Sequence, residues 1–420
     1  MTALAIATRR TFRALRIRNY RLYFLGQIVS FSGTWMQTVA QMWLVLRLTG
    51  SGTALGITTA LQFTPMLLAG AWGGVLADRV DKRRLLMCTQ SVQALLALVL
   101  GTLVITGKAE LWMVYALAFA LGCVIVADNP TRQSFAIEMV GPDDLTNAVG
   151  LNSTIFTAAR VIGPALGGVV IAAFGVALCF FFNAFSYLAV IGALAAMNPD
   201  ELHRSEPIER AGGQLREGLR YAWQTRALRL PLLMMVVIGT LAFNFRVLLP
   251  LMAESVFSGG AGTYGILSAM LGAGTLLGSL GIAGRARPTL KVLLGAALAY
   301  GVLIILGGLA PTLGLELMVL VPMGAAGLAF AATANAMLQL NADANMRGRV
   351  MALYAVVFLG STPIGGPIIG LVAEHLGVRA AFHLGGVATI IASLAAIYWA
   401  KTATTRSERI SVRNTNVSPT

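Results

Sequence analysis

Two arginines stand inside apolar stretches, where a cation is expensive. Arg160 lies near the middle of the stretch at about 146–173, and Arg246 lies in the stretch at about 230–252. A cation at the centre of a bilayer costs about 2.5–3.5 kcal/mol to insert, so it persists where the protein interior uses it. A buried guanidinium can bind an anion or support a nearby carboxylate. We expect Arg160 to face an internal cavity. Arg246 either faces it too or reaches outward to the water interface.

A stripe of polar side chains runs along the first apolar stretch, at about 22–46. The residues recur at intervals of three or four, which places them on one face of a helix, with Gln37 close beside them. Such a face is typical of the wall of a water-accessible cavity, although hydrogen bonding to a neighbouring helix is the alternative. The stripe consists of Gln27, Phe31, Thr34, Thr38 and Gln41.

Three asparagines in other apolar stretches are further candidates for the substrate cavity. Asn152 falls within a quarter turn of Arg160, and Asn335 falls near one end of its stretch. Asn244 stands about 200° from Arg246 around a regular helix, so the two cannot face one cavity together. We include all three asparagines as candidates and favour Arg246 over Asn244.

No spacing of His, Cys or carboxylate residues supports an enzyme or a metal site. The sequence has no G-x-x-x-x-G-K-[ST] loop for ATP, no H-E-x-x-H and no G-x-S-x-G. The histidines and cysteines are scattered along the chain: His203, His375, His383, Cys88, Cys123 and Cys179. We therefore expect no catalytic residue, no cofactor and no bound metal.

The elements that carry these residues must lie in a membrane. Of 420 residues, 57% are hydrophobic and 11% are charged, whereas soluble domains carry about 25% charged residues. Stretches long enough to cross about 30 Å of hydrocarbon recur along the whole chain. They fall at about 22–46, 53–77, 85–106, 111–133, 146–173, 176–197, 230–252, 263–284, 289–310, 314–338, 349–373 and 379–400. The sequence predicts an all-α polytopic membrane protein with twelve transmembrane helices.

The twelve stretches form two sets of six around one long polar segment. That segment contains "QLREGLRYAWQ", which predicts an interfacial helix. "VIGPALGGVVIAAFG" in the first set resembles "IGGPIIGLVAEHLG" in the second, and their Gly-Pro pairs stand 203 residues apart. Such duplication is typical of transporters built from two pseudo-symmetric bundles. The predicted parts are an N-terminal bundle (1–197), a cytoplasmic loop (198–229), a C-terminal bundle (230–400) and a cytoplasmic tail (401–420).

The distribution of basic residues predicts the orientation. The N-terminus, the even-numbered loops and the C-terminal tail hold 26 of the 31 Lys and Arg residues, whereas the odd-numbered loops hold only Arg47, Lys108 and Arg379. Because Lys and Arg collect on the cytoplasmic side, both termini are expected there, in a bacterial inner (plasma) membrane. The net charge of +14 comes in short bursts between apolar stretches, so we expect no nucleic-acid partner.

A burst of charge in "GGVLADRVDKRRLL", residues 73–86, directly follows the second apolar stretch. Gly73 and Gly74 carry no side chain, so a neighbouring helix can pack closely there. Asp78 stands where a carboxylate can accept hydrogen bonds from the free N–H groups of another helix. The basic residues that follow either pair with acids on nearby loops or serve as a cytoplasmic anchor.

The segment "GGVLADRVDKRR" resembles the signature G-x-L-a-D-r-x-G-r-k of major facilitator transporters, with Asp81 where the signature usually has Gly. The resemblance implies that Asp78 caps the eleventh helix. It also implies that Lys82 joins a charge relay with Asp128, the acid at the end of the fourth span. In the family these contacts hold the outward-open state and break on switching. The implied conformational latch consists of Gly73, Gly74, Asp78, Lys82, Arg83, Asp128 and Arg132.

A second segment, "RVIGPALGG", resembles the G-P-x-x-G-G antiporter motif of drug exporters. Its residues Gly163, Pro164, Gly167 and Gly168 allow close packing and a kink, and generic small-residue packing is the alternative. With "ADNPTRQSF" and "RGRVMALY", the chain resembles the bacterial branch of the major facilitators that contains enterobactin-type siderophore exporters and related drug efflux proteins. The resemblance runs from about Asn19 to Tyr398.

The resemblance implies a secondary active transporter that exports small amphipathic molecules by alternating access, coupled to protons as an antiporter. A lipid flippase or a small-solute importer on the same fold is the alternative, and a passive channel is a further rival. We expect the partners to be a small-molecule substrate, membrane lipid and the proton, with the protein acting as a monomer.

Overall fold

The computed structural model describes residues 12–203, 214–283, 288–343 and 345–415, and these residues form helices and no strand. This confirms the predicted all-α class. The α-helices are α2 (Arg18–Thr49), α3 (Gly52–Arg79), α4 (Lys82–Ile105), α5 (Leu111–Phe174), α6 (Ala177–Ala195), α7 (Gln214–Gln224), α8 (Arg226–Leu241), α9 (Phe245–Leu251), α10 (Ala261–Ala283), α11 (Leu290–Leu309), α12 (Leu313–Asn341), α13 (Arg347–Leu376) and α14 (Val378–Thr415). Short turns of other helix types are η1 (Arg13–Arg16), η2 (Pro199–Glu201) and η3 (Met252–Val256).

The long helix α5 contains two of the predicted spans. Its backbone leaves the helical region at Gly141, where φ is +72° and ψ is 177°. Glycine adopts this conformation without a steric cost, and the following Pro142 is suited to the first turn of a new helix. The chain therefore reverses here, and the fourth and fifth spans are the parts of α5 before and after Gly141.

The described helices account for all twelve predicted spans. Nine helices among the described residues are long and apolar enough to cross a membrane, and α3, bent by 66° between Gly52–Gly70 and Trp72–Arg79, makes a tenth. Division of α5 adds the eleventh, and α2 adds the twelfth. The polar stripe on α2 lowers its hydropathy, which is why length and composition alone miss it.

Local signals explain most helix ends. α2 ends at Gly50, whose φ of +62° suits glycine. Ser51 begins α3 by accepting a hydrogen bond from the backbone N–H of Ala54 at 3.1 Å. Asp81 does the same for α4, accepting from the N–H of Arg84 at 2.9 Å. Such caps satisfy backbone donors that the helix leaves free. The Asp in place of the signature Gly therefore starts the third span.

Two boundaries differ from the prediction. The predicted interfacial helix is α7, with the predicted residues. However, α14 continues to Thr415, beyond the predicted end of the last span near residue 400. No Gly or Pro follows Trp399 until Pro419, so nothing in the sequence ends the helix at the membrane surface.

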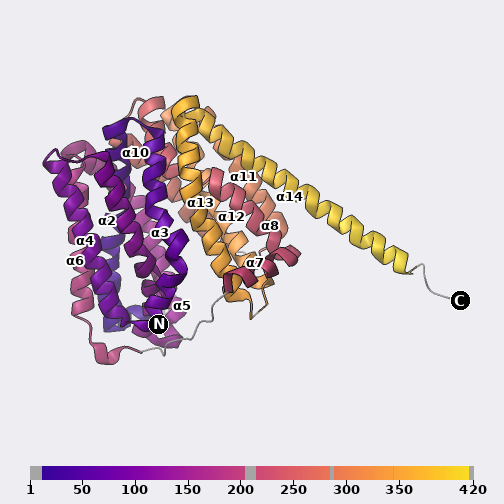
Figure 1. The fold of residues 1–420 in the computed structure, drawn as a ribbon, viewed down its shortest axis with the longest axis horizontal. Helices are drawn as coiled ribbons and strands as arrows, with labels where there is room; N and C mark the ends of the chain where they lie inside the picture. The colour runs from indigo at the N-terminus through magenta and orange to yellow at the C-terminus, as the bar shows by residue number, and fades with distance from the viewer. Residues whose placement is uncertain (1–11, 204–213, 284–287, 344, 416–420) are drawn as a thin grey trace, which may run out of the picture.

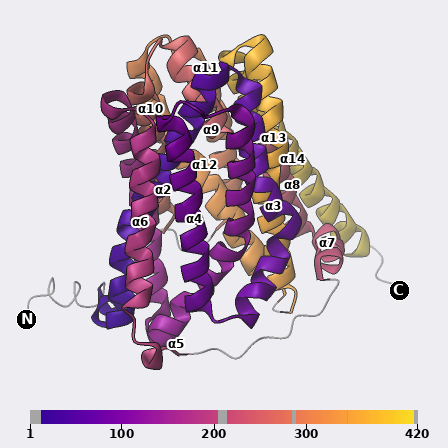
Figure 2. The same ribbon diagram turned by 60° about the vertical axis from the view of Figure 1, so that its left-hand side comes forward.

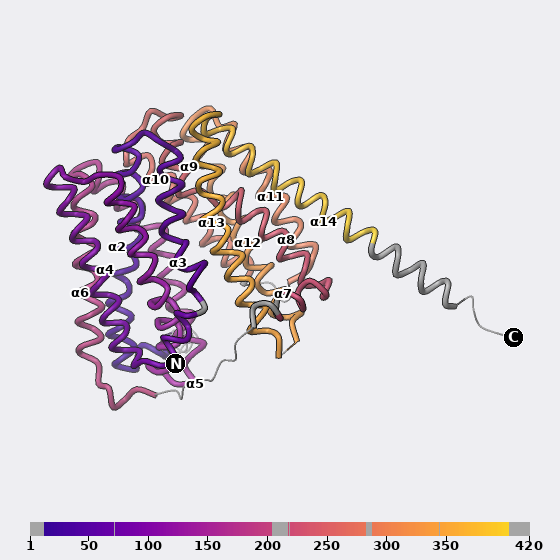
Figure 3. The backbone as a smooth tube through the Cα atoms, viewed as in Figure 1, coloured from indigo at the N-terminus to yellow at the C-terminus, as the bar shows by residue number. Residues whose placement is uncertain are grey.

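The helices form two bundles that meet side by side (Figure 1). The indigo to magenta helices α2 to α6 form one bundle, and the rose, orange and yellow helices α8 to α14 form the other. The bundles converge where α2 turns into α3 and α13 turns into α14, and they diverge toward the opposite end, as the backbone trace also shows (Figure 3). Figure 2 shows α7 apart from the N-terminal bundle, at the end of α8.

Two helix pairs join the bundles, α3 with α13 and α5 with α10. Both pairs touch through glycines. A Cβ atom on Gly56 of α3 would lie 2.4 Å from the carbonyl oxygen of Gly366 of α13, and one on Gly168 of α5 would lie 2.9 Å from the Cα atom of Gly265 of α10. Residues without side chains let helix backbones approach this closely. The internal Gly-Pro similarity therefore marks two helices, α5 and α13, that both lie at the junction.

Candidate functional site

Two guanidinium groups flank one tryptophan between the bundles. The guanidinium carbon of Arg160 lies 5.4 Å from the ring centroid of Trp35, and that of Arg246 lies 5.7 Å from it. Arg246 also lies 5.1 Å from the ring of Phe63. Trp35 and Arg160 belong to the N-terminal bundle, and Arg246 belongs to α9 of the other. The cluster therefore spans the junction.

Aromatic rings extend this cluster along α2. Phe156, one turn before Arg160 on α5, packs edge-on against Phe31 at 5.3 Å and against Trp35 at 5.9 Å between ring centroids. Each contact between a cation and a ring contributes about 0.5–2 kcal/mol when water is excluded. We call Phe31, Trp35, Phe63, Phe156, Arg160 and Arg246 the Trp35 site.

Within the described part of the chain, no carboxylate neutralises the two arginines of the Trp35 site. Among the described residues, neither Arg160 nor Arg246 forms an ion pair. Their distances of 5.4 and 5.7 Å to one centroid place their guanidinium carbons at most the sum, about 11 Å, apart. Two cations this close repel each other and are costly inside a membrane. The arrangement is therefore suited to an anion that approaches both.

A third arginine near the site is already neutralised. Arg132 donates to a carboxylate oxygen of Asp128 at 2.7 Å, and its guanidinium lies 5.4 Å from the ring of Phe31. Asp128 also accepts hydrogen bonds from Thr89 at 2.7 Å and from Gln90 at 2.8 Å, all within the N-terminal bundle. The Asp128–Arg132 pair therefore supports one side of the site and carries no free charge.

The glutamines of the polar stripe do not line an open cavity. Gln27 is 1% exposed and accepts a hydrogen bond from Arg132. Gln37 is buried and accepts from the side-chain amide of Asn183 on α6 at 2.6 Å, and Gln41 is buried as well. The cavity prediction is wrong for these three, because helix-to-helix hydrogen bonds hold Gln27 and Gln37 and packing covers Gln41.

The threonines of the stripe are more open. Thr34 is exposed and Thr38 is half-buried, and each hydroxyl donates to a backbone carbonyl one turn earlier at 2.9 Å. Such back-bonding satisfies the hydroxyl of Thr38 within its own helix, and the hydroxyl of Thr34 also lies 3.5 Å from that of Tyr187 on α6. These two positions, together with Phe31, keep the predicted place on an accessible face of α2.

The asparagine candidates lie in three different settings. Asn244 is buried in a break between α8 and α9, where its amide donates to the carbonyl of Thr240 at 2.7 Å. Because of this break, the angle of about 200° between Asn244 and Arg246, which assumes a regular helix, does not apply. Asn244 is buried and does not face a cavity. Asn152 is half-buried, with its side-chain oxygen 3.5 Å from the hydroxyl of Tyr20. Asn335 accepts from Gln339 at 2.7 Å near the end of α12, away from the Trp35 site.

The break in the seventh span also decides the position of Arg246. It follows the break directly and reaches Trp35 and Phe63 of the opposite bundle, so the outward-reaching alternative is wrong. Sequence reasoning missed Trp35 and Phe156 as site residues. The available signal was that Phe31 and Trp35, and likewise Phe156 and Arg160, stand four residues apart and so share a helix face.

The charged burst makes its described contacts within one bundle. Lys82 pairs with Glu138 at 2.5 Å, and both side chains are 8% exposed. The prediction that Lys82 pairs with Asp128 is wrong. Asp128 precedes Glu138 by ten residues, or about 15 Å of helix, and pairs with Arg132 instead. Arg83 donates to the carbonyls of Leu194 at 2.6 Å and Ala195 at 3.0 Å, which closes the end of α6.

The remaining motif residues lie at close helix contacts. A Cβ atom on Gly73 would lie 1.9 Å from the carbonyl oxygen of Val126, whereas Gly74 and Asp78 are half-buried further along α3. In the "GPALGG" segment, Gly163 and Gly167 face α2 and Gly168 faces α10. Pro164 lies inside α5 between them. The segment therefore holds α5 against both bundles at once, beside Arg160.

At the converging end, a carboxylate links the bundles. Glu374 near the end of α13 accepts hydrogen bonds from the hydroxyl of Ser51 at 2.6 Å and from the backbone N–H of Thr53 at 2.8 Å. Arg47 and Glu254 also approach across the junction, at 4.0 Å. No sequence pattern distinguishes Glu374, because only the fold brings α13 to the start of α3.

Twelve spans in two bundles, with a charged and aromatic site between them, define a membrane transporter. Residues 9–419 match the family of transmembrane secretion effectors, and the chain belongs to this family of major facilitator transporters. It is 24% identical to the staphyloferrin A transporter of Staphylococcus aureus, over 88% of this chain and 93% of that protein. It is 26% identical to the multidrug efflux pump Tap of Mycolicibacterium fortuitum, over 90% and 94% of the two chains.

Solved structures share the fold at low sequence identity. A bacterial homologue of the iron transporter ferroportin in an inward-facing state has a TM-score of 0.70 and 16% identity, over 92% of this chain and 98% of that one. A bacterial homologue of the lysosomal transporter Spinster has a TM-score of 0.69 and 15% identity, over 90% and 94%. The predicted fold is confirmed. The chain is a multi-pass bacterial membrane protein, not an enzyme, and it exports small molecules.

Proposed function

We propose that this exporter works by alternating access and that its substrates carry a negative group beside an apolar or aromatic part. The observation that supports this is the Trp35 site, where Arg160 and Arg246 flank Trp35 from opposite bundles and form no ion pair among the described residues. Arginine binds carboxylates through paired hydrogen bonds, and the rings offer a flat apolar surface. A substrate bound there touches both bundles, so binding and bundle movement are coupled.

We infer that the structure represents a state closed at the outer end. The contacts between Glu374 and the start of α3 lie at the end that the Lys and Arg distribution assigns to the outside. Glycine contacts between α3 and α13 reinforce closure there. The bundles diverge toward the other end (Figure 1). Opening to the outside then requires loss of the Glu374 hydrogen bonds.

We propose that the charged burst, residues 73–86, forms the corresponding latch at the inner end of the two bundles. Lys82 and Arg83 bond the start of α4 to α5 and α6, which supports a role for the nearby end of α3, with Asp78, as a fixed corner of the N-terminal bundle. We propose that this corner meets the start of α13 when the inner end closes. Residues 1–197 and 230–400 then act as the two moving units, and 198–229 joins them.

Replacing Glu374 with Gln should favour the outer-open state. The charge at a helix start contributes about 1 kcal/mol, so its loss should shift the populations about fivefold. Spin labels at Thr106 and Ala310, at the outer ends of the two bundles, would report the change as a larger population of long distances. The control is Glu110→Gln, because Glu110 bonds only locally to Trp112 at 2.7 Å. Equal distance distributions for Glu374→Gln and wild type would contradict the outer latch.

We also propose that both termini lie in the cytoplasm. In a cysteine-free background, Glu201→Cys at an exposed position of η2 should resist an impermeant maleimide added to intact cells, and Lys108→Cys should react. The expectation rests on the concentration of Lys and Arg in the even-numbered loops. Labelling of position 201 from outside would refute the orientation.

We propose that the proton is the coupling ion, with Asp128 as the group that exchanges it. Asp128 is 3% exposed within a span, and protonation would release Arg132. The proposal also holds that the exporter acts as a monomer. A substrate panel in a drug-hypersensitive host, with and without a proton uncoupler, tests the coupling. Export that continues undiminished with the uncoupler would argue against protons.

A further inference from the structure

A second group of arginines and tryptophans lies outside the junction, where α7, α8 and α14 meet. The guanidinium carbon of Arg226 lies 4.5 Å from the ring centroid of Trp399, and that of Arg229 lies 4.8 Å from it. Arg229 also lies 6.0 Å from the ring of Trp223. Arg226 donates to the backbone carbonyl of Trp399 at 3.4 Å. Both arginines belong to the first turn of α8, at the predicted cytoplasmic surface.

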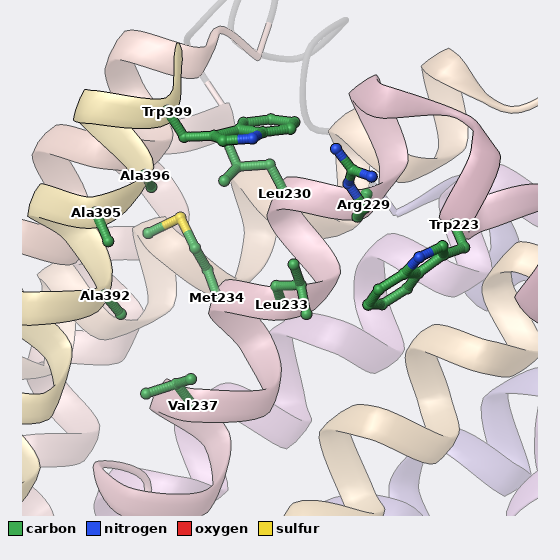
Figure 4. A pocket seen from close by; sticks show the side chains of 10 residues that line it. All are labelled: Trp223, Arg229, Leu230, Leu233, Met234, Val237, Ala392, Ala395, Ala396 and Trp399. Carbon is green, nitrogen blue, oxygen red and sulfur yellow. The ribbon is translucent and has the colours of Figure 1, made fainter. Parts of the chain in front are cut away.

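An apolar cavity of about 440 Å³ runs from this group along α8 (Figure 4). Leu233, Met234 and Val237 form one wall, and Ala392 and Ala395 of α14 form the other. The small alanines leave the groove open between the two helices. Val237 is eight residues beyond Arg229, so the groove reaches about 12 Å into the membrane.

The charge of the two arginines is not balanced by an acidic side chain among the residues that the structure describes. Among the described residues, neither Arg226 nor Arg229 forms an ion pair. A guanidinium held over an indole keeps most of its hydrogen-bond donors available for a phosphate, and Arg226 uses one of its donors for the carbonyl of Trp399. The combination of paired cations at the surface with an apolar groove below them is complementary to an anionic amphiphile.

We propose that this groove is a binding site for one anionic phospholipid of the inner leaflet. The phosphate contacts Arg226 and Arg229, Trp399 lies at the level of the head group, and an acyl chain occupies the groove between α8 and α14. Tryptophan favours this level of a membrane because its ring is apolar and its N–H is polar. The site lies on α7 and on helices α8 and α14 of the C-terminal bundle and takes no residue from the Trp35 site, so it is separate from substrate binding.

Native mass spectrometry of the delipidated protein with equal amounts of phosphatidylglycerol and phosphatidylcholine tests the proposal. The wild type should retain one phosphatidylglycerol at least about tenfold in preference to phosphatidylcholine. Both lipids carry a phosphate, but the cationic choline group cancels its charge and would lie beside the two arginines, whereas phosphatidylglycerol is a net anion. The double variant Arg226→Gln, Arg229→Gln should lose this preference. The control, Arg84→Gln with Lys291→Gln, removes two other exposed charges at the same predicted membrane face and should keep it.

A second variant tests the groove without touching the arginines. Ala395→Trp fills the space between α8 and α14 and should release the lipid. Excess inorganic phosphate should fail to displace it from the wild type, since the acyl chain contributes to binding. Equal retention of the two lipids by the wild type, or an unchanged preference in the double variant, would overturn the proposal. Displacement by phosphate alone would instead indicate a simple phosphate site and would overturn it too.

Discussion

Replacement of Arg160 with Ala is expected to abolish export of carboxylate-bearing substrates in a protein that still inserts and folds. A charged hydrogen bond contributes about 1.5–3 kcal/mol, so the apparent affinity should fall about ten- to 150-fold. Arg160→Lys should keep part of the activity, because the charge remains while the paired hydrogen bonds are lost. Export, membrane abundance and melting temperature are measured on the same preparations.

Arg246→Ala is the matched variant, because Arg246 flanks the same ring from the other bundle. Its loss should lower export of the same substrates, and neutral esters of those substrates should be less affected by either change. If Arg160 were instead the partner of a buried acid, its removal should destabilise the protein by about 3–5 kcal/mol. An Arg160→Ala variant with normal stability and normal export of every substrate would refute both roles.

Replacement of Lys82 with Ala should cause the largest loss of stability. It removes the ammonium group that contacts the buried Glu138 at 2.5 Å, and breaking a buried ion pair in this way costs about 3–5 kcal/mol. We expect low membrane abundance and a clearly lower melting temperature. Arg84→Ala, two residues away and exposed, is the control and should change little.

Removal of both charges should reverse most of that loss. In Lys82→Met with Glu138→Gln, no buried charge remains unpaired, and a neutral pair of similar volume is often tolerated. The measurement compares the melting temperature of the double variant with the melting temperatures of the two single variants, which gives the coupling between the two substitutions. If Lys82→Ala melted with the wild type, the pair would be a surface contact, contrary to the 8% exposure of both side chains.

The sequence predicted the spans well because their length and hydropathy are local properties. The helix at 214–224 and the two-bundle arrangement follow from periodicity and internal similarity alone. Arg160 was also predictable, since a cation in an apolar stretch is conspicuous wherever the fold places it. Its ring partner Trp35 was not, because that contact depends on how α2 and α5 pack against each other.

The predictions that the structure contradicts share a physical cause, which is that they depend on how helices pack against one another. The partner of Lys82 was assigned by resemblance, but Glu138 and Asp128 stand on one helix, and only its position against α4 decides between them. The seventh span breaks at Asn244 without a Gly or Pro at that point, so its faces were miscounted. The glutamines of α2 have the same pattern whether they face water or a neighbouring helix, and the structure shows that they are buried against it.

The most direct test of the anion site between the bundles is transport of matched substrates by the purified protein in liposomes. A panel of aromatic carboxylates and their methyl esters is offered with an imposed proton gradient, to the wild type and to the double variant Arg160→Gln, Arg246→Gln. We expect the wild type to move carboxylates at least about tenfold faster than their esters and the double variant to lose this preference. Equal rates for acids and esters in the wild type, or a preference that survives in the double variant, would contradict an anion site between the bundles.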